Sequence, residues 1–211
     1  MIRVAISVEG QTEREFVNKV LLPHLMEYNV SINPVIVTTS KDRCGRKNPG
    51  GCINIDRIKN EIIRLLPHFD YVTTFYDFYG FSKRPTDDVD ELEEILFKCF
   101  NDRKFIPYIQ KYEFETLLFS KPEYFEEYFK NDKIANEMEK IIASFQDDIE
   151  KINDSPQTAP SKRIEKLFKE MGESYDKVFY GEAIASDIGL NTIRKKALRF
   201  NQWLNQLEHL I

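Results

Sequence analysis

Acidic side chains follow two apolar runs of this chain, and they are the residues best suited to chemistry. Glu9 comes directly after residues 3–8, and Asp77 comes directly after residues 71–76. Carboxylates gathered at one crevice suit a hard divalent cation such as Mg²⁺, which takes oxygen ligands. A cation held there would stabilise charge on a phosphate and lower the pKa of an attacking water.

Glu13, four residues after Glu9, adds a third candidate catalytic carboxylate, and Gly10 between them allows a tight turn. Taken alone, Glu13 is better interpreted as a charge in the first turn of a helix, where acids are common. For Glu9 with Asp77 the functional interpretation is favoured, because their pattern puts both at strand ends.

The elements that must position these acids are strands and helices in alternation. Short β-branched apolar runs predict four strands, at residues 3–8, 35–39, 71–76 and 105–110. Helical spacing predicts helices between them, the first capped by Thr12 with Glu15 three residues later. This alternation indicates a parallel sheet with helices on both faces, in which ligands bind beyond the carboxyl ends of the strands.

After residue 110 the pattern becomes helical. Helices are predicted at residues 114–119, 122–129, 134–152, 160–171 and 192–210. We therefore expect an α/β core over residues 1–110 and a mainly helical C-terminal extension over residues 111–211, packed on the core.

Composition limits the cellular location and the kinds of ligand that we expect for this protein. The chain has 211 residues, 42% of them hydrophobic, and no run approaches the roughly 18 apolar residues that cross a bilayer. With no basic leader at the start and three irregularly spaced cysteines (Cys44, Cys52 and Cys99), we expect a cytoplasmic protein with neither a disulfide framework nor a zinc site. The net charge of −5 argues mildly against tight non-specific binding to nucleic acid, but it leaves room for a local basic groove.

Further candidate residues lie in the second half. A predicted helix begins with Ser161, Lys162 and Arg163. Either these residues hold a phosphate at the helix N-terminus, or Ser161 simply caps the helix. Glu113 and Glu115 would share a face on a strand and diverge on a helix, so they either extend an acidic site or cap a helix.

Two basic segments have equally open interpretations. One is a helical stretch that either contacts nucleic acid or forms a solvated face: Arg194, Lys195, Lys196 and Arg199. The other is a glycine-bearing loop after the second strand that either closes over phosphates or is a surface loop: Lys41, Arg43, Arg46 and Lys47.

Six motifs, in this order, resemble known proteins: Val8-Glu9-Gly10-x-Thr12-Glu13, Tyr-Asp-Phe-Tyr-Gly-Phe at 76–81, Gln-Lys-Tyr-Glu-Phe-Glu-Thr-Leu-Leu-Phe at 110–119, Thr-Ala-Pro-Ser-Lys-Arg at 158–163, Ile-Gly-Leu at 188–190 and Phe-x-x-Trp-Leu at 200–204. A Glu after the first strand and an Asp after the third resemble the TOPRIM fold of topoisomerases, primases and certain nucleases. Over nearly the whole chain, the motifs resemble a TOPRIM-like bacterial family labelled domain of unknown function 4276.

The resemblance implies a Rossmann-like, TOPRIM-like sheet and a Mg²⁺- or Mn²⁺-dependent, nuclease-type cleavage of phosphodiesters in DNA or RNA. Glu9 would be general acid/base or metal ligand, Asp77 a metal ligand, and Glu113 and Glu115 an extension of the acidic site. Such proteins resemble small companions of ATPases encoded nearby in prokaryotic defence against phage.

One departure leaves a second function open. Tyr79 stands where TOPRIM proteins have a second Asp, and a phenol is a poor Mg²⁺ ligand at neutral pH. Either Glu9 and Asp77 bind metal with help from Glu13, Glu113 or Glu115, or catalysis has been lost. In the second case the crevice would belong to a non-catalytic module that binds a nucleotide, nucleic acid or a partner protein.

Overall fold

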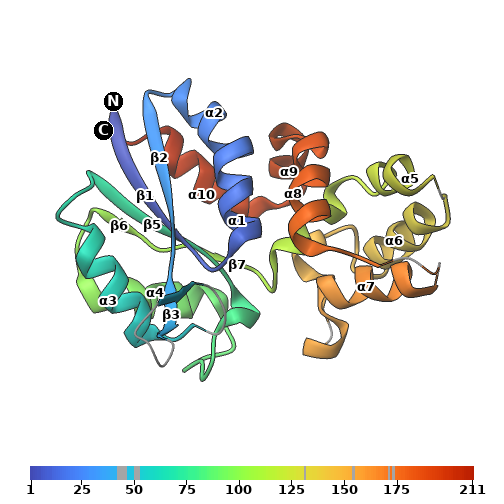
Figure 1. The fold of residues 1–211 in the computed structure, drawn as a ribbon, viewed down its shortest axis with the longest axis horizontal. Helices are drawn as coiled ribbons and strands as arrows, with labels where there is room; N and C mark the ends of the chain where they lie inside the picture. Colours follow the sequence, from blue (N-terminus) through green and yellow to red (C-terminus); the bar gives the residue numbers. More distant parts are fainter. Residues whose placement is uncertain (42–46, 50–52, 131, 154, 171, 173) are drawn as a thin grey trace. The chain divides into compact units, whose positions relative to one another are not determined.

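The chain forms two compact units. A computed structural model describes residues 1–41, 47–49, 53–130, 132–153, 155–170, 172 and 174–211. Unit 1 comprises Met1–Lys111 together with Gln206–Ile211, and unit 2 comprises Tyr112–Asn205. Figure 1 shows that the sheet belongs to the first half of the chain and that helices make up the second.

Unit 1 is built on a parallel sheet with strand order β2-β1-β5-β6, in which a short strand β7 also pairs with β5. The strands are β1 (Ile2–Val8), β2 (Val30–Ile36), β5 (Tyr71–Asp77), β6 (Phe105–Ile106) and β7 (Ile109–Gln110), and all their pairings are parallel. From their second or third residue onward, β1 and β5 are buried, as the near-continuous apolar strands of parallel sheets are. The predicted parallel α/β fold is confirmed.

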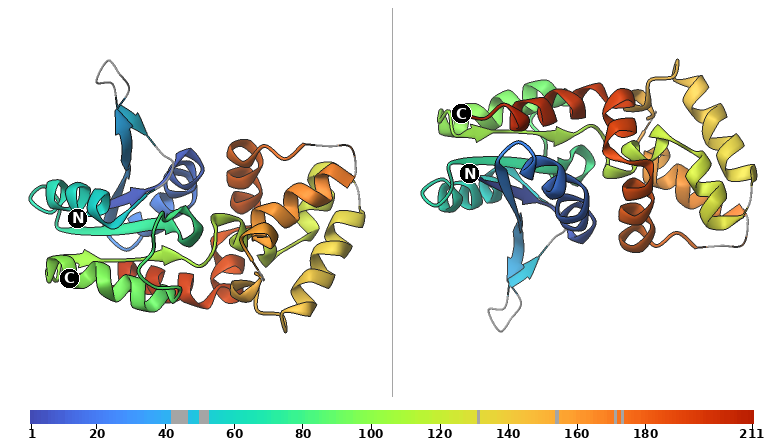
Figure 2. Two further views of the ribbon diagram at one scale, coloured as in Figure 1. Left: turned by 90° about the horizontal axis from the view of Figure 1, so that it is seen from below. Right: turned by 90° about the horizontal axis from the view of Figure 1, so that it is seen from above.

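Helices connect these strands. They are α1 (Gln11–Phe16), the π-helical η1 (Val17–Leu21), α2 (Leu22–Met26), α3 (Ile55–Leu65), the 3₁₀ turn η2 (Phe78–Gly80) and α4 (Val89–Phe100). An antiparallel hairpin of β3 (Thr38–Lys41) and β4 (Lys47–Pro49) extends away from the sheet, as Figure 2 shows.

The connections run outward from the middle of the sheet in both directions. From β1 the chain passes to β2 on one side, and from β5 it passes to β6 on the other. Strand order therefore reverses between β1 and β5, and such a switch point opens the ligand crevice of open α/β sheets.

Two strand predictions need correction. The second strand begins at Val30 rather than at residue 35, because polar residues and Pro34 mask it; proline is tolerated there since β2 is an edge strand. The fourth strand is divided into β6 and β7, and Pro107 lies in the break, where a proline cannot donate to the ladder.

The first helix also differs from its prediction. Its N-cap is Gly10 rather than Thr12, and Glu13 occupies the third helical position. Farther along, the N–H of Leu22 bonds to the carbonyl of Val17, five residues back, so the helix widens just before Pro23. A proline removes one helical hydrogen bond, and a π-turn accommodates that loss.

Unit 2 is helical throughout. It contains the 3₁₀ helix η3 (Phe114–Ser120), α5 (Glu123–Phe129), α6 (Asp132–Ser144), the short η4 (Ile149–Lys151) and η5 (Pro156–Thr158), α7 (Pro160–Glu170), α8 (Lys177–Ile188), α9 (Leu190–Lys196) and most of α10 (Leu198–Glu208). The predicted helical character of this half is therefore confirmed.

In this half the bounds of two predicted helices were wrong, and one helix was not predicted. The helix predicted at 134–152 ends at Ser144, where Gln146 and Asp147 adopt left-handed φ angles of 60°. The helix predicted at 192–210 is two helices separated at Ala197, whose backbone is extended. The sequence pattern did not predict α8, which ends at Ile188 and is followed by Gly189, whose φ of 77° glycine accommodates readily.

Aromatic packing fills unit 2. The ring of Phe168 lies 4.4 Å from that of Phe129 and 6.2 Å from that of Phe125, both in edge-on arrangements that favour aromatic pairs. The apolar side chains of η3 are buried as well, so this short helix runs through the core of the unit.

Candidate functional site

Glu9 and Asp77 lie at the same edge of the sheet. Asp77 is the last residue of β5, and Glu9 directly follows β1. The two strands pair in parallel with Val8 opposite Phe75, so their carboxyl ends are adjacent. Asp77 is 7% exposed and Glu9 is half-buried. Both acids therefore lie at the switch point between β1 and β5, as expected for a ligand site.

Gly80 makes room for the carboxylate of Glu9. A Cβ atom at Gly80 would overlap Glu9 Oε2 and lie 2.7 Å from Glu9 Cδ. The turn after β5 is therefore in contact with the acid after β1. The pattern after the third strand did not reveal this role of Gly80, because it depends on a contact between distant segments.

A buried hydroxyl pair lies on the two strands that lead to the acids. The Tyr76 hydroxyl lies 2.5 Å from Ser7 Oγ, and Tyr76 is fully buried. Burial raises the pKa of the Tyr76 phenol well above its usual range; the Ser7 hydrogen bond opposes the shift, and the charges of Glu61 and Glu9 add to it. The phenol therefore stays neutral at the site.

Gln110 lies beside Asp77, since β7 pairs with β5 with these two residues opposite each other. Its side chain is fully buried, and its Oε1 accepts a hydrogen bond from the Tyr108 hydroxyl at 2.8 Å. Gln110 is not among the residues predicted to form the site. Its signals in the sequence are its position at the end of the fourth strand and its place at the start of the motif at 110–119.

Glu13 has a structural task. It is 4% exposed, and its Oε2 accepts a hydrogen bond from the backbone N–H of Gly10 at 2.9 Å, which ties the start of α1. This contact matches the helix-terminus interpretation. The catalytic role assigned to Glu13 stays a prediction.

Arg84 completes the turn after β5. Its Nη1 donates to the carbonyl of Phe78 at 3.3 Å, and its guanidinium carbon lies 4.3 Å from the centre of the Phe78 ring. Arg84 was not predicted, because it is a single arginine outside the basic segments.

The acids fit a small divalent cation in part. Among the residues that the structure describes, no group of three or more His, Cys, Asp or Glu side chains is placed to hold a metal ion. Mg²⁺ commonly binds through one or two carboxylates and keeps several waters. Glu9 and Asp77 would supply those carboxylates, and Glu13 is held by its cap.

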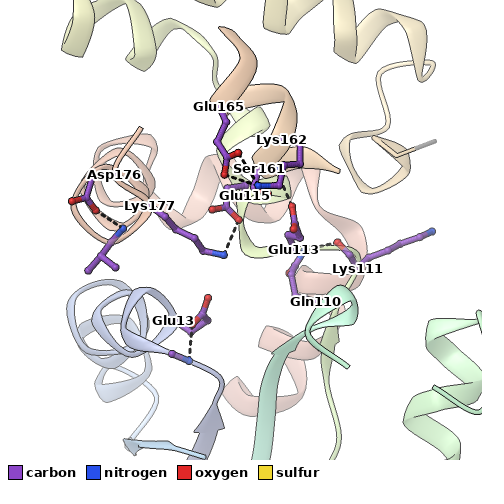
Figure 3. Close-up of polar contacts among 12 residues, drawn as sticks. Glu13, Gln110, Lys111, Glu113, Glu115, Ser161, Lys162, Glu165, Asp176 and Lys177 are labelled. Atoms are coloured by element: carbon purple, nitrogen blue, oxygen red, sulfur yellow. Dashed lines mark hydrogen bonds and ion pairs between the residues drawn. The ribbon is translucent and has the colours of Figure 1, made fainter. Parts of the chain in front are cut away.

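A second polar cluster lies within unit 2, as Figure 3 shows. Glu113 Oε2 accepts a hydrogen bond from the backbone N–H of Ser161 at 2.9 Å. The N-terminus of α7, which the sequence analysis considered as a phosphate site, is therefore bound by a carboxylate of the same unit.

Lys162 and Arg163 are also engaged inside unit 2. Lys162 Nζ lies 2.8 Å from Glu165 Oε2, and Arg163 Nε donates to the carbonyl of Thr158 at 2.7 Å. Their predicted contact with substrate stays a prediction, and the structure gives each of them a local partner.

Glu115 is fully buried in this cluster. Its Oε2 lies 3.1 Å from Lys177 Nζ. Burial raises the pKa of Glu115 to about 7; the cation of Lys177 opposes the shift and the charge of Glu113 adds to it. The Tyr175 hydroxyl is buried and makes no hydrogen bond within the described residues, and burial raises its pKa well above the usual range.

The remaining candidates have mixed outcomes. Arg194 Nε donates to Asn201 Oδ1 at 2.7 Å and its Nη2 to Asn205 Oδ1 at 2.5 Å, so this member of the C-terminal basic stretch ties two helices together. Cys99 is a half-buried free thiol. The basic-loop residues Arg43 and Arg46 and the cysteines Cys44 and Cys52 lie outside the described residues. None of the helices in the described parts of the chain has the length and apolar character to span a membrane.

The parallel sheet, with Glu9 and Asp77 at the edge where β1 and β5 end, defines the class of protein: a parallel α/β protein with paired acids at its switch point. The family described as Domain of unknown function (DUF4276) matches residues 8–208, and the chain belongs to this family. The resemblance to that family is thereby confirmed. No curated protein and no solved structure matches the chain.

Proposed function

We propose that this protein is a TOPRIM-like enzyme that cleaves phosphodiester bonds in DNA or RNA with Mg²⁺ or Mn²⁺. The placement of Glu9 and Asp77 at the switch point between β1 and β5 carries the proposal. A crevice there collects the residues at both strand ends. Two carboxylates at one edge match the oxygen ligands that Mg²⁺ prefers.

The two acids have different tasks in this proposal. When bound, a divalent cation neutralises phosphate charge and lowers the pKa of a water. Asp77, which is nearly buried at the end of β5, binds that cation. Glu9 is held against Gly80 and moves a proton as general acid or base, or is a second ligand.

The test is cleavage of labelled DNA and RNA by purified protein with Mn²⁺, with Mg²⁺ and with EDTA. We expect weak, metal-dependent cleavage that Glu9→Gln and Asp77→Asn each abolish. Calorimetry should show Mn²⁺ binding that Asp77→Asn removes. Glu94→Gln, which removes a 62% exposed carboxylate on α4, is the matched control and should leave both properties unchanged.

Weak cleavage is expected because Tyr79 stands in place of an acid. Restoring a carboxylate with Tyr79→Asp should raise the affinity for Mn²⁺, because it adds an oxygen ligand near Asp77. An ATPase belongs in a second set of reactions if one is encoded nearby, because the resemblance implies such a partner. Absence of cleavage in both sets, with Tyr79→Asp changing neither Mn²⁺ binding nor rate, contradicts the proposal.

A second function has its own support. Tyr79 and the lack of a three-acid group among the described residues favour a non-catalytic module that binds nucleic acid, a nucleotide or a partner protein at the same edge. This alternative is favoured if the Asp77→Asn variant binds nucleic acid with wild-type affinity and no condition yields cleavage.

A further inference from the structure

The turn after β5 combines an aromatic surface with a cation. Phe78 and Tyr79 belong to η2, and the guanidinium carbon of Arg84 lies 4.3 Å and 5.6 Å from their ring centres. Phe78 is buried, whereas Tyr79 is half-buried and keeps part of its side chain at the surface. Arg84 holds its place through these rings, because a cation within about 6 Å of a ring centre is attracted to it.

Backbone contacts fix this turn in place. Ile53 N–H donates to the carbonyl of Gly80 at 3.0 Å, and Ser82 N–H donates to the carbonyl of Ile53 at 2.8 Å. The Ser82 hydroxyl adds a second bond to that carbonyl at 2.9 Å. A surface held in this way loses little conformational freedom when a ligand binds.

Arg84 has donors to offer a ligand. Its Nη1 bonds to the carbonyl of Phe78, and its Nη2 lies 3.1 Å from Asp87, whose side chain is 93% exposed. A guanidinium has five N–H donors, and exposed ion pairs are weak, so a phosphate can replace Asp87.

The same turn touches both acids of the proposed site. Asp77 immediately precedes η2, and Gly80 lies against the carboxylate of Glu9. A phosphodiester held at Glu9 and Asp77 would therefore meet Tyr79 and Arg84 on one rigid segment.

We propose that Tyr79 and Arg84 bind single-stranded nucleic acid, with an unpaired base stacked on Tyr79 and a neighbouring phosphate on Arg84. This inference rests on the proposed function, because it places the strand at the Glu9–Asp77 edge. A duplex hides the faces of its bases, whereas a single strand offers them to aromatic rings. The net charge of −5 also disfavours broad electrostatic contact with a duplex.

The test is fluorescence anisotropy in EDTA, where binding is read without metal-dependent cleavage. The probes are a labelled single strand of about 12 nucleotides and the matched duplex. We expect the single strand to bind more tightly. Tyr79→Ala should weaken that binding about fivefold or more, whereas Tyr79→Phe, which keeps the ring, should stay near wild type. Arg84→Gln should weaken binding and lower the salt dependence by about one phosphate contact.

Matched controls lie at the other end of the strands. Tyr28 is 43% exposed and precedes β2, and Arg103 is exposed and precedes β6. Tyr28→Ala and Arg103→Gln remove the same chemical groups and should leave binding unchanged. Circular dichroism melting of every variant separates loss of binding from loss of fold.

Several outcomes overturn the inference: no binding by the wild type, equal affinity for strand and duplex, or wild-type affinity in both Tyr79→Ala and Arg84→Gln. Glu9→Gln separates this inference from the proposed hydrolysis, because it should bind the strand and not cleave it. If binding depends on Tyr79 and Arg84 but no preparation cleaves the strand, the proposal of hydrolysis is wrong and the inferred binding site stands. If the wild type cleaves, and Tyr79→Ala binds and cleaves as well as the wild type does, the inferred binding site is wrong and the proposed hydrolysis stands.

Discussion

The carboxylate of Glu9 packs against Gly80, a residue that has no side chain. The contact between Gly80 and the Glu9 carboxylate joins the end of β1 to the turn after β5. Gly80 needs no unusual backbone angle, since its φ is not in the left-handed region. The lack of a side chain at Gly80 is therefore explained by packing against Glu9 rather than by backbone freedom.

Gly80→Ala should displace the Glu9 carboxylate and destabilise the protein by about 1–3 kcal/mol, the usual cost of an added methyl group in a packed site. Guanidinium unfolding measures this cost. In the Glu9→Ala background the same change should cost much less, because the atoms that clash are absent. Equal costs in both backgrounds would show that the contact carries no energy.

Prediction from sequence works for residues whose place in the fold follows from local pattern. Glu9 and Asp77 were found because each follows an apolar strand, and parallel strands bring such ends together. Gln110 and Gly80 could not be found in this way. Their roles depend on pairing between β5 and β7 and on contact with a distant side chain.

At the scale of elements, carboxylates bind the N-termini of helices. Glu113 accepts from the N–H of Ser161 at the start of α7, and Glu150 accepts from the N–H groups of Arg199 and Phe200 at the start of α10. An acid is favoured there by the unpaired N–H groups and the helix dipole. The sequence predicted where α7 begins, but not that a glutamate 48 residues earlier would occupy its end.

The Glu115–Lys177 pair should make the stability of unit 2 depend on pH. The folded pKa of Glu115 is raised from 4.5 to about 7, so the folded state binds a proton that the unfolded state releases. The contribution of Glu115 to the free energy of unfolding should therefore be highest below about 4.5 and fall as the pH rises to about 7. Urea unfolding followed by the fluorescence of Trp203, the single tryptophan, measures this change in unit 2.

Two variants test whether the Glu115–Lys177 pair causes this pH dependence. Glu115→Gln removes the titrating group and should flatten this part of the pH profile. Lys177→Met removes the cation that lowers the pKa of Glu115, so it should destabilise the protein more at pH above 7 than near 4.5. A wild-type profile retained by Glu115→Gln would assign the pH dependence to other groups.

At the scale of the molecule, the last helix contributes to both units. Residues of α10 up to Asn205 belong to unit 2, and Gln206–Ile211 belong to unit 1. Within unit 1, His24 Nε2 lies 2.6 Å from Glu208 Oε1, and the Tyr71 hydroxyl donates to the carbonyl of Ile211 at 2.9 Å. The helical pattern predicted a C-terminal helix, but no local signal told which unit its last turn completes.

Leu207→Ala should therefore destabilise unit 1, although Leu207 follows even the last strand of the sheet, β7, by 97 residues in sequence. Leu207 is fully buried, and truncating such a leucine costs about 2–5 kcal/mol. Hydrogen exchange measured by mass spectrometry should show faster exchange in β1 and β5. Leu198→Ala is the matched control, because Leu198 belongs to the same helix but is 63% exposed. Faster exchange confined to η3 and α8 would assign the end of α10 to unit 2 instead.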